Sequence, residues 1–162
     1  MNNSKKTAMS VNSKPNKDLI NALSVLNRNT TILDFGAGNG RHSNALRELG
    51  FKVYSYDPYN GNKNADPYKE VSNVLPASTF DYVFTAFVLN VVDKNEAANI
   101  INRCESLTAN KGNVIHLVRE DLRNLKGKSK ITAKGTYQRD VTIKELTDLG
   151  YNRNGKLFTK TK

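Results

Sequence analysis

The chain has 162 residues, of which 38% are hydrophobic and 25% are charged, and this composition suits one globular domain rather than two. No apolar run approaches the roughly 18 residues of a membrane-spanning helix, and residues 1–15 are too polar for a secretory signal, so we expect a cytoplasmic protein with no membrane partner. A single cysteine, Cys104, excludes an internal disulfide, and only two histidines leave little for a metal site.

The net charge of +10 comes from the two flanks of the chain. Residues 21–118 carry nine basic and nine acidic side chains, whereas residues 1–20 carry four against one and residues 119–162 carry twelve against five. A neutral centre with basic flanks suits a protein that binds nucleic acid or another phosphate-bearing partner. Solubility alone would explain the same charge, so the composition leaves both interpretations open.

The first half of the chain predicts alternating helices and strands. Residues 1–12 are rich in Asn, Ser and Lys, and we expect a flexible segment there, followed by a single domain over residues 13–162. Ser13 to Pro15 predict the start of an amphipathic helix. Further along, the pattern predicts a strand at 31–35, a helix at 41–48 and a strand at 52–56. This alternation indicates a parallel β-sheet.

The second half continues the alternation and ends in a hairpin. We expect a polar loop over 58–70, a strand at 80–87, a helix capped by Asp93 that runs to Leu107, and a strand at 113–118. A basic connection over 119–136 then leads to a helix that begins at Thr142 and ends near Gly150. Asn154-Gly155 lies between short strand-like runs and predicts a tight hairpin over 151–158.

A glycine-rich turn joins the strand at 31–35 to the helix that follows it. Between Asp34 and Gly40, glycine occupies every second position. Glycines let the main chain approach a ligand closely, and the start of the helix offers unpaired N–H groups. Asp57 ends the next strand, where a carboxylate can accept both hydroxyls of a ribose. We therefore expect a nucleoside-containing cofactor, although the spacing fits neither a Walker A loop nor a dinucleotide fingerprint.

The order Asp-x-Gly-x-Gly-x-Gly, with Asp57 after the second strand, resembles the class I S-adenosylmethionine-dependent methyltransferases. The resemblance spans roughly Ser13 to Phe158 and implies a Rossmann-like α/β fold, with a mostly parallel sheet and a C-terminal antiparallel hairpin. It also implies that S-adenosylmethionine is the cofactor. The residues implied to contact this cofactor are Asp34, Gly36, Ala37, Gly38, Asn39, Gly40, Asp57, Pro58 and Phe87.

A narrower resemblance concerns four short strings of the sequence. They are similar to small bacterial and phage methyltransferases found near DNA modification systems, which implies a link to such systems. The chain departs from that group at Lys14, Ala37, Arg41 and His42. The first string is Lys6 to Ser10 with Ser13 to Pro15, and the other three are Leu33 to Gly36, Asp57 to Tyr59 and Val88 to Asp93.

Residues that act on the methyl acceptor are less clearly marked, because methyl transfer is an in-line displacement that depends mainly on positioning. Asn90 is our candidate catalytic residue, since its amide could orient an acceptor, but it could equally satisfy loop backbone. Cys104 and His116 fall on apolar patterns and are interpreted as core. His42 could face the cofactor or lie on the surface.

Substrate contacts are predicted from the strand at 113–118 onward. Arg119 follows that strand, at the sheet edge where α/β proteins bind ligands. Tyr137 could stack on a base while Arg139 and nearby lysines contact phosphates, although a solvated loop would explain the same residues. We expect a methyltransferase that acts on a nucleic-acid or phosphate-bearing substrate. The alternatives are a small-molecule methyltransferase and a non-catalytic cofactor-binding or accessory module.

Overall fold

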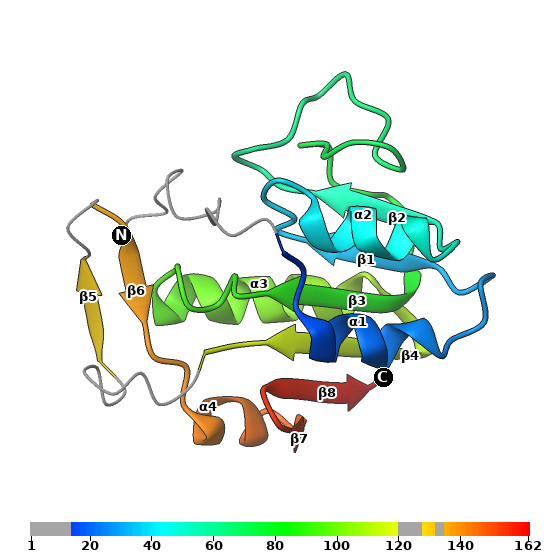
Figure 1. The fold of residues 1–162 in the computed structure, drawn as a ribbon. Helices are drawn as coiled ribbons and strands as arrows, with labels where there is room; N and C mark the ends of the chain where they lie inside the picture. Colours follow the sequence, from blue (N-terminus) through cyan, green and yellow to red (C-terminus); the bar gives the residue numbers. More distant parts are fainter. Residues whose placement is uncertain (1–13, 120–127, 132–134) are drawn as a thin grey trace.

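The computed structural model describes residues 14–119, 128–131 and 135–162 (Figure 1). Its main sheet has six strands in the order β2-β1-β3-β4-β8-β7. The first four strands in this order are parallel, and the last two continue the sheet in antiparallel pairing. The predicted α/β fold, with a mostly parallel sheet and a C-terminal antiparallel hairpin, is confirmed. The strands are β1 (Ile32–Phe35), β2 (Val53–Tyr56), β3 (Phe80–Ala86), β4 (Thr108–Leu117), β7 (Asn152–Asn154) and β8 (Leu157–Thr161).

Helices cover both faces of this sheet. One face packs against α1 (Lys17–Ser24) and α2 (Arg41–Glu48), and the other packs against α3 (Lys94–Ser106) and α4 (Ile143–Thr147). The central parallel strands are therefore covered on both sides, which explains why β1 and β2 are buried at nearly every position instead of at alternate ones. Within the described ranges, no helix has both the length and the apolar character needed to cross a membrane.

Side-chain caps set the starts of three helices. Asp93 accepts the backbone N–H of Glu96 at 2.8 Å, and Thr142 caps α4 in the same way, so both predicted helix starts are confirmed. The first helix instead begins after Asn16, whose side chain accepts the N–H of Leu19 at 3.0 Å. The predicted cap at Ser13 and the expected flexible segment 1–12 lie outside the described residues.

The strand predicted at 113–118 starts earlier, at Thr108. The pairing of β3 with β4 shifts register between Phe80 and Tyr82, so the strand contains an irregularity near Gly112. A Cβ atom on Gly112 would lie 2.7 Å from the carbonyl oxygen of Asp81, which is too close. Only glycine therefore fits at this irregular position of β4. The glycine that appeared to precede the strand therefore lies within it.

A second, two-stranded sheet occupies part of the predicted basic connection. It pairs β5 (Ser129–Ile131) with β6 (Tyr137–Arg139) and lies near the start of α3, beyond the carboxyl ends of β3 and β4 (Figure 1). The sequence did not predict it, because β5 is exposed along its length and shows no apolar alternation. Residues 120–127 and 132–134 of that connection lie outside the described part of the chain.

Candidate active site

The turn between β1 and α2 forms the centre of the site. Gly36, Gly38 and Gly40 have φ angles of +80°, +59° and +82°, a left-handed conformation that favours glycine. The N–H groups of Gly36 and Ala37 donate to the carbonyl of Tyr56 at 2.7 and 2.9 Å, which fixes the turn against the end of β2. Gly40 is the N-cap of α2 and supplies no side-chain cap. The turn and the helix start can therefore receive a polar ligand.

Asp57 ties this turn to the loop that follows β2. Its Oδ2 accepts the N–H of Gly38 at 2.9 Å, and its Oδ1 accepts the backbone N–H groups of Tyr59 and Asn60 at 2.8 and 2.9 Å. The residue is 2% exposed. Because each carboxylate oxygen has two lone pairs, Oδ2 keeps room for one further donor. The ribose contact of Asp57 stays a prediction. The structure adds a second role, in which Asp57 holds the glycine turn to the loop after β2.

Asp34 lies behind the turn at the head of a chain of hydrogen bonds. Its Oδ2 accepts the hydroxyl of Ser43 at 2.7 Å, Ser43 accepts the hydroxyl of Ser55 at 2.6 Å, and Ser55 accepts Nη2 of Arg47 at 2.7 Å. Burial raises the pKa of Asp34 to about 7, against the lowering effects of the Ser43 bond and the Arg47 charge. These partners were not predicted from the sequence. Their signal is the spacing of Ser43 and Arg47, one helical turn apart on the face of α2 toward the sheet.

The chain after β3 closes against the glycine turn. A Cβ atom on Gly36 would lie 2.6 Å from Cγ2 of Val88, so the two segments touch. The neighbouring Phe87 is half-buried and adopts φ +61°, an uncommon conformation for a non-glycine residue. Arg119, which follows β4, places its Cζ 5.0 Å from the centroid of the Phe87 ring. Residues from the carboxyl ends of β1, β2, β3 and β4 thus meet at one edge of the sheet, where ligands of α/β proteins bind. Val88 was not among the residues predicted for the site.

The predicted phosphate contact of Arg139 disagrees with the structure. Arg139 is 6% exposed, and its Nη1 donates to both carboxylate oxygens of Glu145 at 2.9 and 2.7 Å. Nη2 and Nε donate to the carbonyls of Leu89 and Val92 at 3.0 and 3.2 Å. The guanidinium faces the protein because Glu145 and these carbonyls satisfy it there. Tyr137, by contrast, is half-buried and lines a shallow pocket beside α3 and α4.

Asn90 is 4% exposed, and its side chain bonds to the backbone of two other segments. Nδ2 donates to the carbonyls of Arg119 and Arg139 at 2.7 and 2.9 Å, and Oδ1 accepts the N–H of Arg119 at 2.8 Å. These bonds agree with the second interpretation given to Asn90, in which it satisfies loop backbone. Its direct contact with an acceptor stays a prediction.

The remaining residues considered for chemistry are buried. His42 is 4% exposed, and its Nε2 accepts the N–H of Asn16 at 3.1 Å, so the surface position considered for it is wrong, while a place next to the cofactor stays a prediction. Burial, with a smaller effect of Arg41, lowers the pKa of His42 to about 4. Cys104 and His116 have no exposed surface and belong to the core, as predicted.

Comparison with protein families identifies the class of this fold. A family model for a methyltransferase domain matches residues 10–151. The chain belongs to this methyltransferase family. A comparison with curated protein sequences finds no match.

Solved structures of other methyltransferases share the fold. One from Burkholderia thailandensis, 1,6-didemethyltoxoflavin-N1-methyltransferase with bound S-adenosylhomocysteine, has a TM-score of 0.64 at 19% identity, over 90% of this chain and 75% of that one. An amino pentose methyltransferase from Micromonospora echinaspora has a TM-score of 0.60 at 14% identity, over 89% and 88%. Magnesium protoporphyrin IX methyltransferase from Synechocystis has a TM-score of 0.59 at 18% identity, over 98% and 79%.

The family and the fold confirm the prediction of an S-adenosylmethionine-dependent methyltransferase with a class I, Rossmann-like architecture. The acceptor is a separate matter. The similar structures named above come from enzymes of a toxoflavin precursor, a sugar and a porphyrin, and none of these names refers to nucleic acid. The predicted link to DNA modification therefore has no support from these relatives.

Proposed function

We propose that this methyltransferase holds S-adenosylmethionine at the turn of residues 34–40, with Asp57, Pro58 and Phe87, and methylates a nucleic-acid or other phosphate-bearing acceptor. The observation that carries the proposal is the convergence of the glycine turn, Asp57 and Phe87 at one sheet edge that is rimmed by cations. A cytoplasmic location is part of the same proposal.

The residues present fit a nucleoside sulfonium. The backbone of Gly36, Gly38 and Gly40 leaves space where side chains would otherwise lie, and the start of α2 has no side-chain cap. Asp57 retains an acceptor position on Oδ2 for a ribose hydroxyl. Asp34 lies behind the turn, where its bond to the Ser43 hydroxyl supports the loop.

S-adenosylmethionine supplies an electrophilic methyl group when it is bound. The task of the chain is then to orient an acceptor in line with that group and to exclude water, which can account for most of the rate of such a displacement. Phe87, Val88 and Arg119 lie on the side of the turn where the acceptor would enter. A general base is needed only for a weak nucleophile, and the acceptor atom decides whether one is required.

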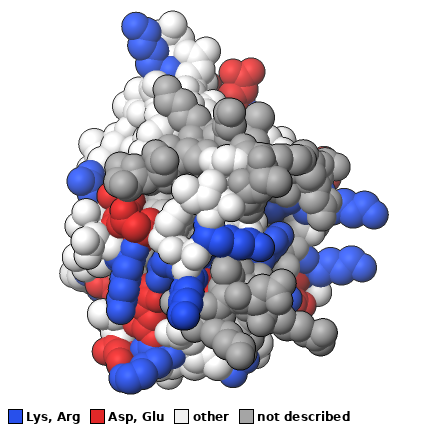
Figure 2. All heavy atoms as spheres, turned by 90° about the vertical axis from the view of Figure 1, so that its left-hand side faces the viewer, with Lys and Arg blue, Asp and Glu red and all other residues white. Residues whose placement is uncertain are grey.

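Basic side chains, with acidic ones between them, lie on the face of the molecule at the sheet edge of the proposed site (Figure 2). Parallel strands end at this edge and the helices after them begin there, so topology places a set of described cations on it. Asp34, Asp57 and Asp140 are 1–2% exposed. The outward-facing positive charge favours phosphate. The cations are Arg41, Lys94, Arg119, Lys128, Lys130 and Lys156.

A small molecule that carries a phosphate or carboxylate is the second candidate acceptor. The similar solved structures named above favour it, since their names refer to small-molecule, sugar and porphyrin substrates. The burial of Arg139 favours it too, because one of the predicted nucleic-acid contacts is occupied within the protein.

Titration calorimetry with S-adenosylhomocysteine, followed by oligonucleotide binding at several salt concentrations, tests the proposal. We expect micromolar binding of S-adenosylhomocysteine and a nucleic-acid affinity that falls steeply with salt. Reversing the charges of Lys128 and Lys130 should weaken nucleic-acid binding and reduce the slope of log K against log salt by about 1.4, two contacts at about 0.7 each on a single strand. The affinity for S-adenosylhomocysteine should not change.

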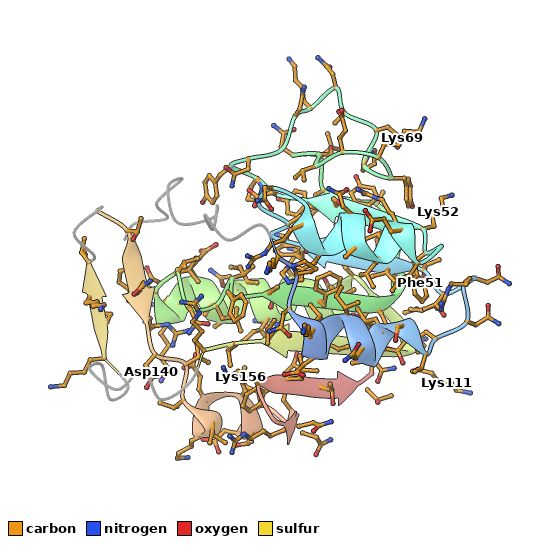
Figure 3. All side chains as sticks on the ribbon, viewed as in Figure 1. Phe51, Lys52, Lys69, Lys111, Asp140 and Lys156 are labelled. Carbon is orange, nitrogen blue, oxygen red and sulfur yellow. The ribbon has the colours of Figure 1, made fainter. Side chains whose placement is uncertain are left out.

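The matched control reverses Lys52 and Lys111, which lie at the opposite edge of the sheet (Figure 3). This variant has the same net charge as the first one, so equal losses in both would show a nonspecific effect of charge. Oligonucleotide binding that is absent in the unmodified protein, together with normal binding of S-adenosylhomocysteine, would favour the small-molecule acceptor. Absence of both would contradict the cofactor assignment.

A further inference from the structure

Asn90 and Arg139 together join three segments that are distant in sequence. The side chain of Asn90 bonds to the backbone N–H and C=O of Arg119 at 2.8 and 2.7 Å and to the C=O of Arg139 at 2.9 Å. The backbone N–H of Arg139 returns a bond to the C=O of Asn90 at 2.7 Å. We call this pair the Asn90–Arg139 clasp. It holds the loop after β3, the end of β4 and strand β6 to one another.

The guanidinium of Arg139 also belongs to the clasp, because it binds the backbone of the loop after β3. It donates to the carbonyls of Leu89 and Val92, on either side of Asn90, and its charge is balanced by both oxygens of Glu145 at the start of α4. A buried charge is retained only when it is paired and hydrogen-bonded in this way. The loop after β3 is therefore fixed at residues 89, 90 and 92, and it has little freedom next to the site.

The clasp lies beside the strained Phe87 and the exposed Arg119. Phe87 keeps φ +61°, a conformation that persists only when the surrounding structure enforces it. Arg119 is bonded through its backbone to Asn90, while its side chain lies over the Phe87 ring. A guanidinium stacked on a ring keeps its in-plane N–H groups directed outward, in the geometry that binds an oxyanion.

We propose that Asn90 and Arg139 are positioning residues, and that they hold Phe87 as a platform on which Arg119 presents its N–H groups to a phosphate or carboxylate of the acceptor. The inference rests on the proposed function, because it concerns the acceptor side of the same site. It changes the role of Asn90 from a group that touches the acceptor to one that acts through Arg119. It also changes Arg139 from a phosphate ligand to a residue that fixes the loop.

Nuclear magnetic resonance of the full chain tests the positioning without knowledge of the acceptor. The side-chain protons of Arg119 should show an upfield ring-current shift from Phe87, and the Arg119 amide should exchange slowly. In Asn90→Ala, we expect the ring-current shift to be lost and the amide to exchange about tenfold faster or more, since its acceptor is removed. Asn95→Ala, an exposed asparagine on α3, is the control and should change neither. A folded Asn90→Ala that keeps both signatures overturns the inference.

Binding of two anionic probes tests the recognition. One probe is inorganic triphosphate, and the other is a single-stranded oligonucleotide of about ten nucleotides. We expect Asn90→Ala and Arg119→Ala each to weaken binding by about tenfold, and the double variant to be no weaker than Arg119→Ala alone. Additive losses would overturn the claim that Asn90 acts through Arg119. Phe87→Leu should lose affinity equally, and it keeps the test decisive if Asn90→Ala does not fold.

The two probes separate failure of this inference from failure of the proposed function. Binding of triphosphate without the oligonucleotide, with the expected losses in the variants, supports the Arg119 site and assigns it to a small anionic acceptor. If neither probe binds although S-adenosylhomocysteine does, the anion site is overturned while the cofactor site stands. If the variants bind both probes as the unmodified protein does, Arg119 is not the recognition residue.

Discussion

The carboxylate of Asp57 accepts the backbone N–H of Gly38 at 2.9 Å and so joins the end of β2 to the middle of the glycine turn. The same carboxylate holds Tyr59 and Asn60 at the start of the following loop. One side chain thus shapes both segments that would contact the nucleoside. Loss of Asp57 is expected to disturb the site itself as well as to remove a ligand contact.

Asp57→Ala should lower both stability and cofactor affinity. The buried N–H of Gly38 and the partly buried N–H groups of Tyr59 and Asn60 lose their acceptor, which costs about 1–3 kcal/mol of unfolding free energy. We expect at least tenfold weaker binding of S-adenosylhomocysteine. Asp57→Asn keeps one oxygen for Tyr59 and Asn60 but presents its amide to Gly38, so its stability should be intermediate. Urea unfolding and calorimetry measure the two effects, and an alanine variant with unchanged affinity would remove Asp57 from the cofactor site.

Gly36→Ala should destabilise the protein more than the positive φ of Gly36 alone predicts. A methyl group at Gly36 would meet Val88 at 2.6 Å, whereas a methyl group at Gly155, which also has a positive φ of +61°, would meet nothing within 4 Å. Both substitutions strain the backbone, by about 1 kcal/mol. Only Gly36→Ala must also displace the loop after β3, at a further cost of about 1–3 kcal/mol.

Thermal unfolding of the two alanine variants provides the comparison, and Val88→Ala in the Gly36→Ala background should recover part of the loss. Equal destabilisation by Gly36→Ala and Gly155→Ala would show that the contact with Val88 is not tight in solution.

Elements with strong local signals were predictable from the sequence, and elements fixed by distant contacts were not. The helix after Asp93 follows from its cap and from the spacing of Ile100 and Cys104, both of which act within a few residues. Strand β5 has three exposed residues, and it is held by pairing with β6, which is itself bonded to Asn90. No local pattern encodes that pairing, so the second sheet was missed.

The same difference between local signals and distant contacts holds for the residues of the candidate site. The glycine turn and Asp57 were found because their sequence spacing reflects backbone geometry, and the structure brings them together. The exposed positions considered for Arg139 and His42 were wrong, although a charged or polar residue in a polar segment is usually exposed. Their burial depends on partners far along the chain, such as the Leu89 carbonyl for Arg139 and the Asn16 N–H for His42. Only the folded chain reveals such partners.

Asp34→Asn should stabilise the protein at neutral and alkaline pH. The native state keeps a proton on Asp34 up to its pKa of about 7, while the unfolded state loses it near 3.8. The raised pKa therefore favours the folded state below about pH 4, and this contribution is lost as the pH rises through 7. The whole change is about 4 kcal/mol. The asparagine variant does not ionise, so its advantage over the natural protein should grow between about pH 4 and 7 and then level off. Urea unfolding across this range measures the difference, and a constant offset would contradict the raised pKa.

His42→Gln should make the protein less sensitive to acid. Neutral His42 accepts the Asn16 N–H at the start of α1, and its pKa is about 4 in the folded state against 6.5 when unfolded. The unfolded state is protonated first, so stability is lost as the pH falls from about 6.5 to 4, by about 3 kcal/mol. His116, whose pKa burial lowers to about 3, adds a loss of the same sign.

The glutamine variant can still accept the Asn16 N–H through its side-chain oxygen, but it does not bind a proton. Its stability relative to the natural protein should therefore rise as the pH falls, and the pH dependence that remains should combine the loss from His116 with the opposite contribution of Asp34. Denaturant unfolding at intervals between about pH 7 and 4 gives both curves. Parallel curves would mean that His42 titrates normally, and that the start of α1 does not depend on the neutral ring.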